Sequence, residues 1–375
     1  MHQNSNAVAW AMYRMPYATT YKRIMQKSGE PVVLSSFDEL AEHSGFCMAP
    51  FALSEDCPIY VIKPDVTEEH SVQIRNINGA RHSDSAEAEE EMKSATAQQR
   101  CKERGRYSET FSMFHSALQD GCFKKIVLAR YSDDMIPEDT EYEDLFHYAC
   151  ELYPRLFIAM VSVDKCGTWL VASPEVLLEG SGARWHTVAL AGTMNLENND
   201  IKSLADGKDE SYSNILWSTK NIQEQHYVAA YINDCLKNIA TDIEETGPYT
   251  VRAGHLVHLK SDFTFTIDNN KSIANLLKRL HPTPAVCGLP KDKAFEYIIE
   301  NEGFSRKYYS GFMGPVNMSG ETHLFVSLRC MNIAAGHCRL YAGGGLLTSS
   351  EEESEWNETE AKLETMRRCI AIRKI

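Results

Sequence analysis

The chain has 375 residues, and 43% of them are apolar, which suits a soluble globular protein with a sizeable core. Its formal charge of −14 excludes the broad basic surface that phosphate backbones and anionic membranes attract, so we expect neither nucleic acid nor a membrane as partner. The eleven cysteines form no Cys-x-x-Cys pair and no zinc-spaced cluster, which favours reduced thiols. No secretory signal is visible and no apolar run could span a bilayer, so we expect a cytoplasmic protein.

The first hundred residues carry weak structural signals and no sharp chemistry. Short alternating segments such as residues 59–62 suggest strands. Between residues 83 and 100 the composition turns to Ser, Ala, Glu and Gln, which is typical of an exposed helix or linker. We therefore predict an N-terminal extension over residues 1–100 that contributes to the sheets and ends in an acidic linker, followed by the main domain over residues 101–375.

The pattern strengthens beyond residue 106. Residues 107–118 are amphipathic and are followed by Asp120-Gly121 and the apolar run 126–129, which predicts helix, turn and strand. Two further apolar runs, residues 157–163 and 168–172, are joined by four residues that include a glycine, which predicts an antiparallel hairpin.

Two long helices are predicted over residues 212–239 and 351–373, because neither stretch contains proline or glycine. The mixture of helices and adjacent strands indicates an α+β fold with antiparallel sheets flanked by helices. No glycine-rich dinucleotide or Walker loop follows a strand, so nucleotide binding has no support.

Charged side chains on the two long helices could hold a hard cation. Glu355, Glu358 and Lys362 fall at i, i+3 and i+7 and share one helix face. On the other helix Glu224 follows Lys220 by one turn. Exposed Glu–Lys pairs are the simpler interpretation of both patterns. Magnesium usually takes one or two protein carboxylates and several waters, so one glutamate from each helix would suffice.

Three consecutive glycines, residues 343–345, follow an apolar strand and precede the last helix. In a loop they would let the backbone approach a ligand and would offer amide donors to an anion. An ordinary flexible turn is the alternative.

Lys125 and Glu175 stand at the ends of apolar strands. Burial lowers the pKa of a lysine toward that of a general base and raises that of a glutamate toward that of a general acid. Most such residues are simply charges at strand ends, so this acid and base pairing is a hypothesis.

Several ordered motifs between residues 105 and 370 resemble those of the chorismate-utilising enzymes, which include isochorismate, salicylate and anthranilate synthases. The motifs are Lys125-Ile126-Val127-Leu128-Ala129-Arg130, Ser173-Pro174-Glu175, Ala191-Gly192-Thr193, His281-Pro282-Thr283-Pro284-Ala285-Val286-Cys287-Gly288, Arg306 with Tyr309 and Gly311, Arg329, the triple glycine, and Glu355-Trp356-Asn357-Glu358-Thr359 with Lys362. The resemblance implies a large fold of two mainly antiparallel sheets packed together and flanked by helices. It also implies Mg²⁺ as cofactor, chorismate as substrate and a monomer.

Two positions distinguish the reactions within this family. Lys125 resembles the lysine that water-using members employ as general base, where anthranilate synthases have glutamine. Ala285 resembles the residue of members that stop at isochorismate, where salicylate-forming and anthranilate-forming members have threonine. The resemblance therefore implies an isomerase, an isochorismate synthase, that adds water at C2 of chorismate with loss of the C4 hydroxyl.

The resemblance also implies a role for each site residue. Glu175 matches the general acid, Glu224 and Glu358 match the direct magnesium ligands, and Glu355 matches a ligand that acts through water. The residues that match substrate contacts are Gly192, Thr193, His258, Ala285, Tyr309, Arg329, Gly343, Gly345 and Lys362. Asn221 departs from the family's Lys-Asp-Arg-x-Glu-His pattern, which implies an altered magnesium affinity rather than an absent metal.

Two alternatives stay open. One is a salicylate synthase that goes on to eliminate pyruvate, and the other is a non-catalytic relative that binds chorismate. The menaquinone and siderophore routes use the same reaction, so the sequence does not choose between these pathways.

Overall fold

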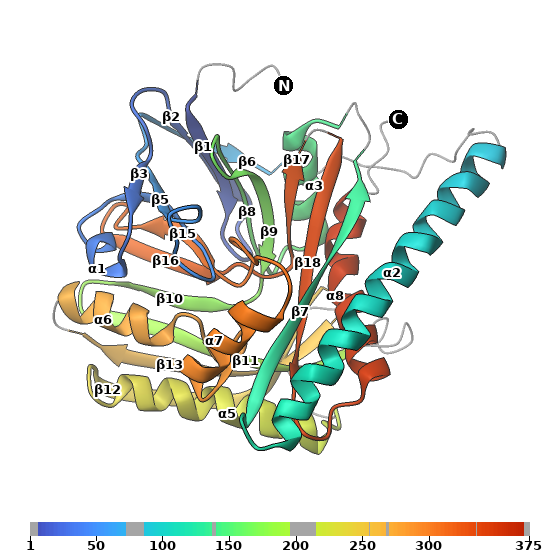
Figure 1. The fold of residues 1–375 in the computed structure, drawn as a ribbon. Helices are drawn as coiled ribbons and strands as arrows, with labels where there is room; N and C mark the ends of the chain where they lie inside the picture. The colour runs from blue at the N-terminus through green and yellow to red at the C-terminus, as the bar shows by residue number, and fades with distance from the viewer. Residues whose placement is uncertain are drawn as a thin grey trace.

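Two large antiparallel sheets form the framework of the protein. The computed structural model describes residues 7–72, 86–136, 140–195, 215–254, 256–267, 270–334 and 336–370. Every strand pairing within these ranges is antiparallel, and helices flank the sheets, as Figure 1 shows. The predicted α+β class with two antiparallel sheets is confirmed.

Each sheet contains nine strands. Sheet A has the order β14 (Gly288–Leu289), β7 (Lys125–Met135), β18 (His337–Leu346), β17 (Cys330–Ala334), β9 (Gly167–Ser173), β8 (Phe157–Val163), β1 (Ala9–Arg14), β2 (Thr20–Gln26) and β6 (Val66–Ser71). Sheet B has the order β12 (Thr241–Ala253), β13 (Leu256–Thr266), β11 (Arg184–Asn195), β10 (Val176–Ser181), β16 (Glu321–Val326), β15 (Phe312–Val316), β4 (Gly45–Ala49), β5 (Ile59–Ile62) and β3 (Val32–Leu34).

Aromatic side chains join the two sheets. Phe157 of sheet A stacks on Phe325 of sheet B with ring centroids 4.1 Å apart, and both are fully buried. Trp169 packs edge-on against Tyr308 at 5.7 Å in the same cluster. Alternating inward residues of both sheets build this shared core, because successive strand residues point to opposite faces.

The remaining faces of the sheets are covered by helices (Figure 1). Sheet B packs on α5 (Thr219–Leu236), α6 (Asn270–Leu280) and the short α1 (Phe37–Leu40). Sheet A packs on α3 (Tyr142–Leu152) and α8 (Glu352–Ile370). Two further helices of the described ranges cover β7, which lies next to the short edge strand β14 of sheet A: α2 (Ala86–Gln119) and α7 (Lys291–Asn301). None of the helices in the described ranges is long and apolar enough to cross a membrane.

The predicted local elements agree with the structure in type and differ at some ends. The predicted hairpin is β8–β9, paired from Phe157↔Ser173 to Val163↔Gly167. The helix predicted from residue 212 begins at Thr219, because Ser218 is extended and its side chain caps the helix by accepting from the Asn221 amide. The last helix ends at Ile370; residues 212–214 and 371–373 lie outside the described residues.

The N-terminal strands belong to both sheets. β1, β2 and β6 lie in sheet A, while β3, β4 and β5 lie in sheet B. Residue 100, the predicted end of the extension, lies within α2. The division of the chain at that residue stays a prediction.

Candidate active site

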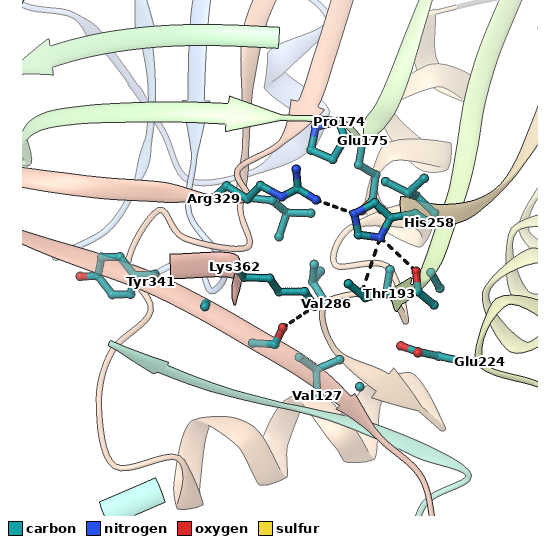
Figure 2. Close-up of a pocket in the computed structure, with 18 of the residues that line it drawn as sticks. Val127, Pro174, Glu175, Thr193, Glu224, His258, Val286, Arg329, Tyr341 and Lys362 are labelled. Atoms are coloured by element: carbon teal, nitrogen blue, oxygen red, sulfur yellow. Dashed lines mark hydrogen bonds between the residues drawn. The ribbon is translucent and has the colours of Figure 1, made fainter. Parts of the chain in front are cut away.

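A pocket between the two sheets gathers most of the predicted site residues. It is lined by Val127, Pro174, Glu175, Leu190, Ala191, Gly192, Thr193, Glu224, His258, Ala285, Val286, Tyr309, Leu328, Arg329, Tyr341, Ala342, Gly343, Gly345 and Lys362. Figure 2 shows these side chains converging from both sheets and from α5 and α8.

Two neighbouring chain crossings between the sheets carry Glu175 and Arg329. Glu175 lies between β9 of sheet A and β10 of sheet B, and Arg329 lies between β16 of sheet B and β17 of sheet A. The crossings are bonded to the ends of these strands: the Val326 amide donates to the Glu175 carbonyl at 2.9 Å, and the Ala172 amide donates to the Arg329 carbonyl at 3.1 Å. Arg329 has a φ of +46°, a left-handed conformation that is strained for arginine and recurs at functional sites.

A bulge in β11 shapes a second wall of the pocket. The pairing of β11 with β13 shifts register between Ala191 and Thr193, so Gly192 is the extra residue, with a φ of +72°. Thr193 then lies opposite His258, and both face the pocket. Glycine suits this position, because a Cβ would also approach Asn221 to 3.2 Å.

His258 and Arg329 form a fixed pair in this wall. The Arg329 Nη2 and the His258 Nε2 are in close contact, and the His258 Nδ1 lies 3.0 Å from the Gly192 carbonyl (Figure 2). A guanidinium can only donate, so Nε2 must accept and Nδ1 must carry the proton that goes to Gly192. His258 is therefore a neutral imidazole that orients Arg329.

Arg329 is a buried cation without a carboxylate partner among the described residues. It is 5% exposed, and its Nη1 donates to the Ala253 carbonyl at 2.8 Å. Burial lowers its pKa to about 10. A desolvated charge of this kind costs free energy unless an opposite charge is supplied. The pocket is therefore suited to an anionic ligand.

Glu175 is the complementary feature, an acid that prefers to keep its proton. Its side chain is buried, and burial raises its pKa to about 8, although the positive charges of Lys125 and Lys362 oppose the shift. Thr283 lies 3.5 Å from Oε1. A carboxylic acid that is largely protonated at neutral pH can donate a proton to a leaving group.

Lys125 lies behind the pocket wall and is paired with Glu224. Its Nζ is 2.9 Å from Glu224 Oε1, an ion-pair distance, and its side chain is fully buried. Burial raises the pKa of Glu224, but Lys125 and Lys220 outweigh it and hold that pKa below the usual range. Gly345 makes room for the pair, since a Cβ there would lie 2.1 Å from Glu224 Oε1 and 2.7 Å from Lys125 Cε.

The carboxylates of α8 lie over Gly344, which precedes Gly345 in β18. A Cβ on Gly344 would lie 3.2 Å from Glu355 Oε2 and 3.8 Å from Glu358 Oε1. Glu358 pairs with Lys362 at 2.7 Å, and Lys362 also donates to the Gly343 carbonyl at 2.8 Å. Glu355 is 1% exposed and pairs through Oε1 with Lys220 of α5.

The donor chemistry of these carboxylates suits Mg²⁺. The Glu355 Oε2 is buried without a hydrogen-bond partner in the described part of the chain, and three glutamates approach the glycine strand. Within the same ranges, no three His, Cys, Asp or Glu side chains are grouped closely enough to form a ready-made metal site. Because Mg²⁺ needs only one or two protein carboxylates, this set of glutamates is compatible with the ion.

Two interpretations of the sequence need correction. The three glycines are not a loop but the end of strand β18, which pairs with β7 as far as Leu346↔Ile126. Lys220 does not pair with Glu224 one turn away, because Lys220 reaches across to Glu355 and Glu224 binds Lys125. Short-range spacing cannot reveal such long-range partners.

The sequence did not single out several pocket residues. Val127, Leu328 and Tyr341 line the pocket within motifs or strands that were noted for other residues. Tyr341 stacks on Tyr309 with ring centroids 5.4 Å apart. Their alternation with buried residues in strands was the available signal, but it does not reveal which face borders a pocket.

Known proteins with this arrangement are the chorismate binding enzymes. The profile of that family matches residues 59–371, so the chain belongs to the family.

Its relatives include isochorismate synthases. The isochorismate synthase DhbC of Bacillus subtilis is 30% identical over 263 residues, which cover 68% of this chain and 65% of the relative. This chain thus spans just under two-thirds of that protein. Two solved structures share the fold. One is assigned to the 2,3-dihydroxybenzoate-specific isochorismate synthase DhbC of Bacillus anthracis, with a TM-score of 0.77, 22% identity and 97% coverage of both chains. The other is MenF, the menaquinone-specific isochorismate synthase of Escherichia coli, with a TM-score of 0.75, 19% identity and coverage of 99% of this chain and 91% of that one.

Proposed function

We propose that this protein is an isochorismate synthase, which converts chorismate to isochorismate by adding water at C2 while the C4 hydroxyl leaves. The observation that carries the proposal is the pairing, in one pocket, of an uncompensated buried cation, Arg329, with a protonated acid, Glu175. Similarity to isochorismate synthases supports the reaction class. The relatives named for menaquinone and for 2,3-dihydroxybenzoate share this reaction, so the proposed activity does not depend on the pathway.

Chorismate carries two carboxylates, and the pocket has a cationic group for each. We assign the enolpyruvyl carboxylate to Arg329 and Tyr309, because a guanidinium fork binds carboxylates with good geometry. We assign the ring carboxylate to Lys362 and to the backbone amides around Gly343 and Gly345. The last five residues of β18 support this, because pairing with β17 ends at Tyr341 and leaves that strand edge beside the pocket.

The proton transfers fall to Glu175 and Lys125. Glu175 gives its proton to the hydroxyl that leaves C4, and Lys125 takes a proton from the water that attacks C2. The two groups interact electrostatically across the pocket wall, since the charge of Lys125 opposes the rise in the pKa of Glu175. Lys125 is held against Glu224 at 2.9 Å, so the base role requires that contact to be broken first.

Glu224 and Glu358 would hold Mg²⁺, with Glu355 acting through water. The bound ion would neutralise the ring carboxylate and the charge of Glu224. The protein itself contributes the alignment: Gly344 and Gly345 bring the strand close to the three carboxylates. The effect of Asn221 on magnesium affinity stays a prediction.

Ala285 lines the pocket and bears on the alternatives. A salicylate synthase would go on to eliminate pyruvate, and by family resemblance it would have threonine at this position. A non-catalytic relative would not need Glu175 in the pocket and Lys125 behind its wall. The same assay separates all three possibilities.

The test is an assay with chorismate and Mg²⁺ in which isochorismate, salicylate and pyruvate are resolved by chromatography. We expect isochorismate from the wild type, and a kcat lowered by about 10²–10⁴-fold in Lys125→Ala and in Glu175→Gln, the range for loss of a general acid or base. Lys124→Ala is the matched control, because Lys124 is the exposed neighbour of the buried Lys125. Near-native turnover in either active-site variant would refute the assigned roles, and salicylate would favour the alternative.

A further inference from the structure

We propose that Tyr107 of α2 is a positioning residue for the carboxylates of α8, and that its hydroxyl is hydrogen-bonded to Glu355 through one bridging water. This inference rests on the proposed function, because it makes α2 part of the cation site. The inference adds α2 to the site, a helix for which the sequence predicts only an amphipathic surface.

One face of α2 docks on the first turns of α8. Arg104 Nη2 lies 2.9 Å from Glu352 Oε1, and Ser108 Oγ donates to Glu352 Oε2 at 3.1 Å. Tyr107 lies on the same helix face, at i+3 from Arg104, and its ring meets the Trp356 ring edge-on at 5.3 Å. The phenol is therefore held against the part of α8 that carries Glu355 and Glu358.

The Tyr107 hydroxyl and the Glu355 Oε2 are both buried and interact electrostatically. Tyr107 is 3% exposed and Glu355 is 1% exposed. Among the residues that the structure describes, neither the Tyr107 hydroxyl nor the Glu355 Oε2 forms a hydrogen bond of normal geometry, although the Ser350 hydroxyl lies close enough to Glu355 to act against the rise in its pKa. Burial raises the pKa of Tyr107, and the negative charges of Glu355 and Glu358 raise it further, so the hydroxyl lies within their field and keeps its proton. A water that accepts from the phenol and donates to the carboxylate would satisfy both groups.

Glu355 would then be held in place by contacts from two helices. Lys220 of α5 holds Oε1, and Tyr107 of α2 would hold Oε2 through the bridging water. Partners of this kind fix the orientation of groups around a metal, and their loss typically weakens metal affinity 10–100-fold.

The test is calorimetric titration of Mg²⁺ alone into the full-length protein. We expect Tyr107→Phe, which keeps the buried ring and removes only the hydroxyl, to weaken Mg²⁺ affinity about tenfold. If Tyr107 acts through Glu355, the double variant Tyr107→Phe/Glu355→Gln should bind no more weakly than Glu355→Gln, since the two losses are not independent.

Two controls separate this role from a structural one. Tyr308→Phe removes another buried hydroxyl, which donates to the Pro58 carbonyl at 3.0 Å in the core between the sheets. Ser108→Ala disturbs the same contact between α2 and α8 without removing the phenol. Both should leave Mg²⁺ affinity unchanged, even where they lower the melting temperature.

The outcomes are distinguishable. A wild type that binds no Mg²⁺ overturns both this inference and the metal in the proposed function. A wild type that binds Mg²⁺, with Tyr107→Phe binding equally well or with additive losses in the double variant, overturns the role of Tyr107 and leaves the proposed function intact.

Discussion

Glu175 illustrates how one buried side chain links chemistry to stability. Its carboxyl is fully enclosed at a sheet crossing, and the cost of desolvating the charged form raises its pKa from 4.5 to about 8. Burial therefore favours the protonated carboxyl, which is the form that the proposed reaction needs as a general acid. Its position after a proline at the end of an apolar strand marks Glu175 as a candidate in the sequence. The sequence does not show that this strand end is enclosed at a crossing between the two sheets.

This raised pKa predicts a stability change with pH. Between pH 4.5 and about 8 the unfolded chain has lost the Glu175 proton while the folded protein retains it, so this residue lowers stability as pH rises through that window. Replacing Glu175 with Gln removes the effect. We expect the stability of Glu175→Gln relative to wild type to increase by a few kcal/mol from pH 5 to pH 8.5.

Denaturant unfolding at the two pH values measures this difference. Glu296→Gln is the control, because Glu296 is an exposed carboxylate on α7. A difference between Glu175→Gln and wild type that stays constant across the range would contradict the buried, protonated state of Glu175.

At the scale of elements, local sequence patterns predict the helices and strands correctly. They do not predict which residues far apart in the sequence become partners. The hairpin of β8 and β9 and the helix–strand order of α2 and β7 follow from periodicity and turn residues close in sequence. In the sequence, the three glycines of β18 are typical of a flexible loop. Their actual role is to leave room for the carboxylates of Glu224, Glu355 and Glu358, which are distant in the sequence. Lys220 and Glu355 lie 135 positions apart, and no local spacing predicts that they pair.

A row of acids and histidines crosses sheet B, and no motif or spacing in the sequence predicts it. His186 of β11 lies 2.8 Å from Glu179 of β10 and 2.7 Å from Asp262 of β13, while His323 of β16 lies 3.0 Å from Glu179. Cross-strand pairs of opposite charge stabilise neighbouring strands. This row joins four adjacent strands next to the wall that carries Gly192 and His258.

The row predicts a second pH dependence. Burial lowers the pKa of His186, but the bonds to Asp262 and Glu179 outweigh it and raise that pKa to about 9. The stabilisation is fully present below pH 6.5 and is lost as pH rises through about 9. On the acid side, burial raises the pKa of Glu179, but His186 and His323 lower it to about 2, so its contribution is present above pH 4.5 and is lost as pH falls through about 2.

We therefore expect His186→Gln to lose about 1–3 kcal/mol relative to wild type near pH 6, and the loss to shrink toward pH 9.5. Melting temperatures of both proteins across this range provide the measurement. His337→Gln, at an exposed position at the start of β18, should show no such trend. A loss for His186→Gln that is equal at pH 6 and pH 9.5 would show that the imidazole is not charged in the folded protein.

At the scale of the whole molecule, the site depends on how distant segments are tied together. The family motifs predicted the pair of antiparallel sheets and most of the pocket, because their order along the chain is specific. Residue types alone could not show that two crossings between the sheets place Glu175 beside Arg329, since that proximity arises from strand order. Arg306 was noted only as a family motif residue, and the structure gives it a role in this organisation.

Arg306 connects three segments around the pocket from a fully buried position. Its Nη1 donates to the Val286 carbonyl at 2.7 Å, its Nη2 donates to the Val127 carbonyl at 3.0 Å, and its Nε donates to Glu302 Oε2 at 2.6 Å. Val127 and Val286 both line the pocket. Arg306 thereby fixes the distance between the β7 wall and the segment that carries Ala285.

Breaking a buried ion pair by removing one partner leaves the other charge uncompensated, which costs about 3–5 kcal/mol. We expect Arg306→Met to lower the free energy of unfolding by this amount, because Glu302 would stay buried against the Ala129 amide without its cation. Lys237→Met is the matched control: its ion pair with Asp234 is exposed, and its loss should change stability by less than about 0.5 kcal/mol. Urea unfolding of both variants measures the two effects. Comparable small losses would mean that water reaches Glu302 when Arg306 is absent, and that the β7 wall and the Ala285 segment are not held together by this pair.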